Sequence, residues 1–258
     1  MTIPPWVLVV DDATVNRALA CQMVRHLGYR TLDVADGHEA IAAVANHPVD
    51  LVLMDCDMPT LDGFAATARI RAHLGPLVRL PIIAMTGNDH ATDRAACLGA
   101  GMDGILVKPF RLAELHALLD RWLPLPRSHI ETDASSTSPW CDPAPMDACE
   151  RMQAGSRAML IGLFLDDLGP AERALATAVA DGNLPEVVRI AHKLKGAALT
   201  IGAKPLGAAM KTCEREARAG MLSACQAFYP ELHQVLTATR NALLAIGVME
   251  RPTHCDVT

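Results

Sequence analysis

The first half of the chain alternates short apolar runs with segments of helical spacing. The apolar runs lie at Trp6–Val10, Thr31–Ala35, Leu51–Met54, Ile82–Met85 and Ile105–Val107. The helical segments lie near residues 14–27, 37–46, 61–74, 90–99 and 111–122. Continuous apolar strands separated by helices are typical of a parallel sheet covered on both faces. The pattern predicts an α/β doubly wound, five-stranded parallel sheet in flavodoxin-like order.

The second half of the chain shows only helical patterns. They run over roughly 147–154, 156–168, 170–181, 184–199, 204–219 and 223–246. Asn183, followed by Pro185 and Glu186, predicts a helix start, because Asn caps well and Pro suits the first turn. Short connections between the helices favour an all-α antiparallel bundle.

Between these halves lies a segment rich in proline, serine and threonine. Pro124, Pro126, Pro139, Pro143 and Pro145 fall within it. Such a segment buries too little apolar surface to fold alone, so we expect a flexible linker. The predicted domains are therefore 4–123, a linker at 124–146, and a helical bundle at 147–248.

Composition narrows the class of protein. Apolar residues make up 51% of the chain, yet no apolar run reaches the roughly 18 residues of a membrane span. The net charge is −6 and no block of Lys or Arg stands out, which argues against nucleic-acid binding. The eight cysteines form no CxxC pair. We expect reduced thiols in a cytoplasmic protein without direct membrane insertion.

Polar residues follow the predicted strands of the first half. Asp11 and Asp12 follow the first strand, Asp55 the third, Thr86 the fourth and Lys108 the fifth. The carboxyl ends of parallel strands meet at one edge of a sheet, where sites in such folds open. We expect these five side chains to lie together.

This set of residues suits phosphoryl chemistry. The carboxylates of Asp11, Asp12 and Asp55, with the backbone carbonyl of Asp57, could form an oxygen-rich site for Mg²⁺ or Mn²⁺. A cation there would relieve the repulsion between a carboxylate nucleophile and an incoming phosphoryl group. Lys108 and Thr86 would serve the remaining phosphoryl oxygens.

A second candidate site surrounds His192 in the helical half. On a helix, Arg189 at i−3, Lys195 at i+3 and Gly196 at i+4 share the face of His192. The pattern predicts an imidazole that projects to solvent between cations, where neutral imidazole is a competent nucleophile near pH 7. Gly196 would give a partner's active site room to close over the ring.

The first half resembles a response-regulator receiver domain. The resemblance rests on LVVDD at 8–12, LVLMDCDMPTLDG at 51–63, IIAMTG at 82–87 and LVKPF at 106–110. It implies that Asp55 accepts phosphate, that Asp12 ligates the metal directly, and that Asp11 does so mainly through water. It also implies signalling roles for Thr86 and Lys108, and a cis bond between Lys108 and Pro109. Ile105 departs from the family, which has an aromatic residue there, so a threonine–aromatic output switch is not expected.

The second half resembles a histidine-containing phosphotransfer (HPt) domain over about 150–246. The matching residues are HKLKG at 192–196, Ile201-Gly202-Ala203, and LFLDDLGPAERAL at 163–175. The resemblance implies that His192 is phosphorylated and that Lys195 and Gly196 support it.

Together the two halves predict a two-component phosphorelay protein, a phosphoryl carrier rather than an enzyme. Asp55 would take phosphate from a sensor histidine kinase, and His192 would exchange phosphate with an aspartate of this chain or of a downstream response regulator. The acidic mouth around Asp55 and a basic strip of Arg189 and Lys195 would be complementary.

Two alternatives stay open at this stage. The DCD block at 55–57 also resembles the nucleophile motif of haloacid-dehalogenase-type phosphohydrolases. In that family, however, the metal-binding acidic pair follows the lysine, whereas Asp11 and Asp12 precede it. The other alternative is a module that docks a kinase without transferring phosphate, which only a transfer assay distinguishes.

Overall fold

The structure is a computed structural model that describes residues 3–75, 78–87, 91–124 and 150–249. The chain divides into two compact units, residues 1–152 and 153–258, and each is described by itself. Within the described ranges, no helix has both the length and the apolar character needed to cross a membrane.

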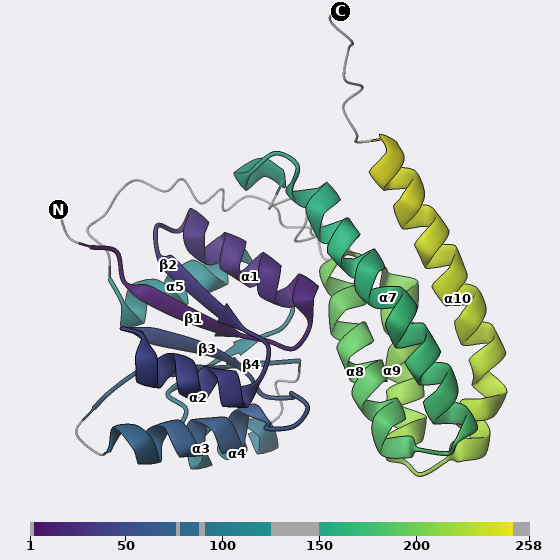
Figure 1. The fold of residues 1–258 in the computed structure, drawn as a ribbon, viewed down its shortest axis with the longest axis horizontal. Coiled ribbons are helices and arrows are strands. Elements are labelled where there is room, and N and C mark those ends of the chain that lie inside the picture. The colour runs from purple at the N-terminus through teal and green to yellow at the C-terminus, as the bar shows by residue number, and fades with distance from the viewer. Residues whose placement is uncertain (1–2, 76–77, 88–90, 125–149, 250–258) are drawn as a thin grey trace, which may run out of the picture. The chain divides into compact units, whose positions relative to one another are not determined.

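The first unit is a five-stranded parallel sheet with the strand order β2-β1-β3-β4-β5 (Figure 1). The strands are β1 (Trp6–Val10), β2 (Arg30–Val34), β3 (Leu51–Asp55), β4 (Ile82–Thr86) and β5 (Gly104–Val107). The helices are α1 (Thr14–His26), α2 (Gly37–Asn46), α3 (Gly63–Leu74), α4 (Ala91–Gly99) and α5 (Leu112–Trp122). The predicted doubly wound fold is confirmed, with the predicted strands displaced by at most one residue at either end.

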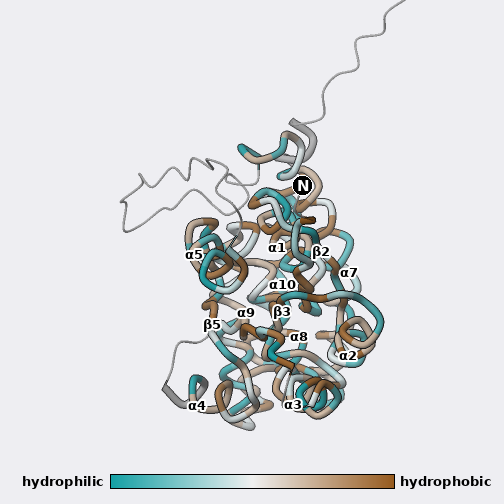
Figure 2. Tube along the Cα trace, turned by 90° about the vertical axis from the view of Figure 1, so that its left-hand side faces the viewer, coloured by the Kyte–Doolittle hydropathy of each residue, from teal (hydrophilic) through white to brown (hydrophobic). Residues whose placement is uncertain are grey.

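The core of this unit lies on both faces of the central strands. Residues Val7–Val10 and Leu51–Met54 are completely buried, whereas the edge strand β2 is half-exposed. Helices α2, α3 and α4 cover one face, where Ala40, Ile70 and Cys97 pack against the sheet, and α1 and α5 cover the other (Figure 1). In Figure 2 the colour along these helices switches repeatedly between hydrophilic and hydrophobic, as expected for helices with one buried face.

The second unit is the predicted all-α bundle. Its helices are α7 (Ser156–Ala180), α8 (Leu184–Thr200), α9 (Lys204–Arg218) and α10 (Leu222–Met249), and they run antiparallel to their sequence neighbours (Figure 1). Phe164, Leu175, Leu194, Met210 and Leu236 are among the residues buried between them. The predicted start of α8 is confirmed, because the Asn183 side chain accepts a hydrogen bond from the Glu186 N–H at 3.3 Å.

One prediction in this unit is wrong. The separate helices expected at 156–168 and 170–181 form a single helix, α7, with Pro170 inside it. A proline costs a helix one backbone hydrogen bond and introduces strain. Leu168 and Leu175, on either side of Pro170, are both completely buried, and this packing holds the two halves of α7 in one helix.

Two further predictions fall mostly outside the described residues. The linker expected at 124–146 lies outside them except for Pro124. Of the short helix expected at 147–154, residues 150–152 are helical and 147–149 lie outside.

The described cysteines agree with the expectation of reduced thiols. Cys21, Cys56, Cys97, Cys213 and Cys225 are all buried thiols that form no disulfide. Burial raises the pKa of the Cys21 thiol to about 12, so this side chain behaves as a small apolar residue.

Candidate functional site

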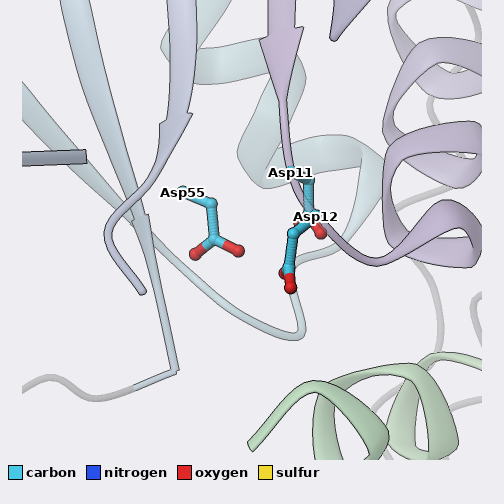
Figure 3. Close-up of side chains that lie close together, drawn as sticks. All are labelled: Asp11, Asp12 and Asp55. Atoms are coloured by element: carbon cyan, nitrogen blue, oxygen red, sulfur yellow. The ribbon is translucent and has the colours of Figure 1, made fainter. Parts of the chain in front are cut away.

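Three carboxylates meet at the carboxyl edge of the sheet. Asp11 and Asp12 follow β1, and Asp55 ends β3 (Figure 3). Strands β1 and β3 are parallel neighbours with Val10 paired to Met54, so their ends lie side by side. One carboxylate oxygen of each aspartate lies within 4.8 Å of the other two. Asp11 and Asp55 are buried, whereas Asp12 is half-buried.

Lys108 enters this cluster from the end of β5. Its Nζ lies 2.6 Å from Asp11 Oδ2 and 2.8 Å from Asp55 Oδ2. Its backbone N–H donates to the carbonyl of Thr86 at 2.6 Å, which joins the ends of β4 and β5. The peptide bond between Lys108 and Pro109 is cis, as the receiver resemblance implies, and Pro109 itself is exposed. The structure therefore brings together four of the five predicted strand-end side chains, Asp11, Asp12, Asp55 and Lys108, and Thr86 ends the neighbouring strand β4.

The charged groups of this cluster shift one another's pKa values. Burial raises the pKa of Asp55 to about 7; Lys108 opposes this shift and the charge of Asp11 adds to it. For Lys108, burial favours the neutral amine, but the charges of Asp11 and Asp55 outweigh burial and raise its pKa above the ordinary value. Lys108 is thus a cation held between two buried acids.

The residues of this cluster fit a divalent cation. Three carboxylates converge on one point, and two of them, Asp11 and Asp55, bind the Lys108 ammonium. Carboxylate oxygens are the hard donors that Mg²⁺ and Mn²⁺ take, and an excess of negative charge favours their binding. The Asp57 backbone N–H lies 3.4 Å from Asp55 Oδ1, so residue 57 borders the same cluster.

The loop after β3 is held tightly behind Asp55. The Cys56 N–H donates to the Met85 carbonyl, and the Gly63 N–H donates to the Cys56 carbonyl, both at 3.1 Å. A Cβ atom added at Gly63 would lie 2.1 Å from the backbone oxygen of Asp55, so only glycine allows this approach. The start of α3 thus fixes the backbone that carries Asp55.

Sequence reasoning missed Arg17, which supports the end of β1. Its Nη1 donates to the backbone carbonyl of Asp11 at 2.6 Å, and its Nε lies 3.3 Å from Asp33 Oδ2. Its position on α1, one turn after the acidic pair, was the available signal. Ile105 lies on β5, half-buried against the core on the α2–α4 face, where it packs as an aliphatic residue.

In the helical unit, His192 lies on α8 as predicted but does not simply project to solvent. Its side chain is 23% exposed, and its Nδ1 lies 2.9 Å from Oε1 of Glu214 on α9. Lys195 Nζ lies 3.4 Å from the same ring nitrogen. The expectation of a solvent-facing ring flanked only by cations is corrected, because the close packing of α8 and α9 places a carboxylate beside the ring.

Glu214 is the functional residue that sequence reasoning missed in this unit. Its Oε2 binds Lys195 Nζ at 2.7 Å, and its Oε1 accepts from Arg218 Nη2 at 2.8 Å as well as facing His192. Burial alone would raise its pKa, but the hydrogen bonds from His192, Lys195 and Arg218 outweigh burial and hold it well below the usual range. A signal existed: Glu214 sits among Met210, Cys213 and Ala217 on the apolar side of α9.

The ionised state of Glu214 determines the hydrogen-bonding role of His192. A carboxylate only accepts hydrogen bonds, so the 2.9 Å contact with Glu214 requires that Nδ1 carries the hydrogen and donates it. Nδ1 then cannot accept from Lys195, whose Nζ at 3.4 Å contributes charge rather than a hydrogen bond to the ring. The lone pair of the neutral ring then lies on Nε2.

The basic strip expected around His192 carries counter-charges. The Arg189 guanidinium bonds to Glu186, with Nη2–Oε1 at 2.5 Å and Nε–Oε2 at 2.8 Å, and Lys195 bonds to Glu214. Gly196 is half-buried on α8, next in sequence to Lys195. The strip is thus less positive than its Arg and Lys residues alone suggested.

Comparison with known families assigns both units. The response regulator receiver domain family matches residues 7–120, and the Hpt domain family matches residues 159–242. The chain joins a receiver domain to an Hpt domain. The two domains support a two-component phosphorelay protein, and the DCD block lies within the receiver match rather than in a dehalogenase-type phosphohydrolase.

Two relatives match most of this chain within longer proteins. The chain is 31% identical to the sensor histidine kinase GacS of Pseudomonas protegens over 222 residues, which are 81% of this chain and 24% of that protein. It is 32% identical to the sensor histidine kinase AruS of Pseudomonas aeruginosa over 213 residues, 82% of this chain and 21% of that protein. The chain therefore spans about a quarter of the length of these relatives.

Among solved structures, the receiver domain resembles that of the sensor histidine kinase PA1611 from Pseudomonas aeruginosa, which has a magnesium ion coordinated in its active-site cleft. The two are 44% identical, with a TM-score of 0.43, over 46% of this chain and 98% of that one.

Proposed function

We propose that the chain carries a phosphoryl group on two side chains, Asp55 of the receiver domain and His192 of the Hpt domain. The observation that carries this proposal is the meeting of Asp55 with Asp11, Asp12 and Lys108 at the sheet edge. The hydrogen bond that prepares the His192 ring in the second domain supports it.

At the receiver site, Asp55 would act as the nucleophile. A divalent cation, Mg²⁺ or Mn²⁺, held by Asp11, Asp12, Asp55 and the backbone carbonyl of Asp57 would neutralise charge on the phosphoryl oxygens. Lys108 would give up its bond with Asp55 and bind a phosphoryl oxygen instead. Its Nζ would stay in place during this exchange because Asp11 Oδ2 binds it at 2.6 Å. The buried Thr86 hydroxyl, at the end of the neighbouring strand, would donate to another oxygen.

At the Hpt site, His192 would act as nucleophile and carrier. Glu214 fixes the hydrogen on Nδ1, so the attacking atom would be Nε2. Lys195 would contribute positive charge beside the bound phosphoryl group, and Gly196 would leave space for the partner's acidic site. Arg189 lies one turn earlier on the same helix, where it would contact the partner.

The partners we propose follow from this chemistry. A sensor histidine kinase would supply phosphate to Asp55, and His192 would exchange phosphate with an aspartate of this chain or of a downstream response regulator. The chain would be a carrier rather than an enzyme with turnover, and it would act in the cytoplasm, where its buried thiols stay reduced. Ile105 suits a receiver that passes phosphate on rather than one that switches through an aromatic ring.

The test uses two single variants, both labelled with a radioactive small phosphodonor and Mg²⁺. Asp55→Asn should lose the base-labile label of an acyl phosphate, whereas His192→Gln should keep it and lose onward transfer. Full labelling of Asp55→Asn would refute the receiver assignment. If Asp55 is labelled in the wild type but neither the wild type nor a variant passes the phosphate on, a kinase-docking module would be favoured.

A further inference from the structure

The equilibrium of phosphoryl transfer between aspartate and His192 depends on how the protein stabilises the charge that transfer creates. In the step that loads His192, the Nε2 lone pair forms a bond to phosphorus, and the bond between phosphorus and the aspartyl oxygen breaks. The aspartate leaves with that electron pair as a carboxylate. The ring keeps its hydrogen on Nδ1 and becomes a cation, so no proton has to move.

The new positive charge forms next to a buried anion. Glu214 Oε1 lies 2.9 Å from Nδ1 of His192, and Glu214 is only 7% exposed. Attraction between opposite charges at such a distance is strong where water is excluded. Only a neutral ring has the Nε2 lone pair that attacks, so relative to this attacking form Glu214 stabilises the phosphorylated, cationic ring more strongly.

Arg218 works against this effect. Its Nη2 and Nε lie 2.8 and 3.2 Å from Oε1, the same oxygen that faces His192. Lys195 instead binds the other oxygen, Oε2, at 2.7 Å. Arg218 therefore shares the oxygen that receives the ring's new charge, although its side chain is 56% exposed and partly screened by water.

We propose that Glu214 and Arg218 are positioning residues of opposite sign that set the equilibrium of phosphoryl exchange: Glu214 draws the group onto His192, and Arg218 limits this bias. The inference rests on the proposed role of His192 as a phosphoryl carrier. It concerns the equilibrium position of the phosphoryl group between aspartate and His192.

The experiment measures exchange between two versions of the full chain. The donor carries His192→Gln and is labelled at Asp55 with acetyl phosphate; the acceptor carries Asp55→Asn, so His192 is its phosphoryl acceptor. Forward and reverse transfer rates are measured separately, and their ratio gives the equilibrium constant. Base-labile and acid-labile phosphate distinguish the two carriers.

In the acceptor, Glu214→Gln keeps a hydrogen-bond acceptor of the same size but removes the charge. We expect it to lower the equilibrium constant for loading His192 by about tenfold. Arg218→Gln should raise the constant by about threefold. The matched control is Arg215→Gln, since Arg215 lies on the same helix but pairs with Glu216 and is 70% exposed; it should change nothing.

The opposite signs separate this inference from a structural role. If the Glu214–Arg218 ion pair only stabilised the bundle, both variants would shift the constant alike or not at all, and the inference would be overturned. If the Asp55→Asn acceptor with intact Glu214 takes up no phosphate, the proposed function is refuted, and the proposed effect of Glu214 and Arg218 on the equilibrium is refuted with it. Transfer with an unchanged constant in Glu214→Gln would overturn the bias alone.

Discussion

At the residue scale, both candidate carriers depend on a charged neighbour from another element. Asp55 is paired with Lys108, which directly follows the separate strand β5, and His192 is paired with Glu214 from the next helix. Lys108 stabilises the negative charge of Asp55 before transfer, and Glu214 stabilises the positive charge of the His192 ring after it. The chemistry of each site therefore belongs to a pair of residues rather than to one side chain.

Glu214 should also stabilise the Hpt domain in a pH-dependent way. Its pKa in the folded protein is depressed, so its stabilising effect is complete above the unfolded value near 4.3 and is lost as pH falls through the folded value. We expect Glu214→Gln to lower the free energy of unfolding by about 1–2 kcal/mol at pH 7. The difference should shrink as the pH is lowered below about 4. Urea unfolding across this range measures it.

Glu186→Gln is the control for this effect. Glu186 pairs with Arg189 at a half-exposed surface position, where an ion pair contributes less than about 0.5 kcal/mol. Equal losses in the two variants at pH 7 would contradict the special role of the buried carboxylate.

Gly63 provides a steric prediction. The added Cβ of Gly63→Ala would lie 2.1 Å from the Asp55 backbone oxygen, so the loop after β3 must shift. We expect a loss of at least about 2 kcal/mol in receiver stability and slower labelling of Asp55. Gly99→Ala, where a Cβ meets no atom within 4 Å, should change the unfolding midpoint little. A stable, normally labelled Gly63→Ala protein would show that the close approach is not required.

At the scale of elements, local patterns located the strands and helices but misjudged where one helix ends. The boundary expected between the segments 156–168 and 170–181 falls at Pro170, and the packing of Leu168 and Leu175 overrides it. Asn183, by contrast, begins α8 as its sequence indicates, since the cap is a local hydrogen bond. A pattern confined to one helical turn predicted a helix end correctly. A proline did not, because contacts distant in sequence offset its cost to the helix.

The proline in α7 should therefore cost stability that an alanine restores. Pro170→Ala would supply a backbone N–H that can donate to the carbonyl one turn earlier. We expect a gain of about 1–2 kcal/mol in the free energy of unfolding, seen as a higher melting temperature. Pro185→Ala is the control, because a proline in the first turn of α8 replaces no hydrogen bond and should bring no gain. A loss of stability in Pro170→Ala would contradict this account.

At the scale of the whole molecule, the chain is two compact units with separate chemistry. We expect Mg²⁺ to stabilise the receiver domain alone, because the carboxylates that converge in the described residues lie at its sheet edge. At a hundred times the dissociation constant, binding adds about 2.7 kcal/mol. Hydrogen exchange, read separately for the two domains, should show protection in residues 3–124 only.

Asp12→Asn should remove most of this protection, since it withdraws one of the three carboxylates. Equal protection of α7–α10 by Mg²⁺ would contradict a site confined to the receiver domain.

The sequence by itself determined the order of strands and helices, the receiver motifs and the identity of Asp55, Lys108 and His192 as candidates. These features are local: apolar periodicity, caps and short motifs are written in consecutive residues. Only the tertiary structure placed Glu214 against His192 and Arg17 behind Asp11. Those contacts join residues on different helices and strands or depend on which face of a helix is buried, and packing between elements decides both.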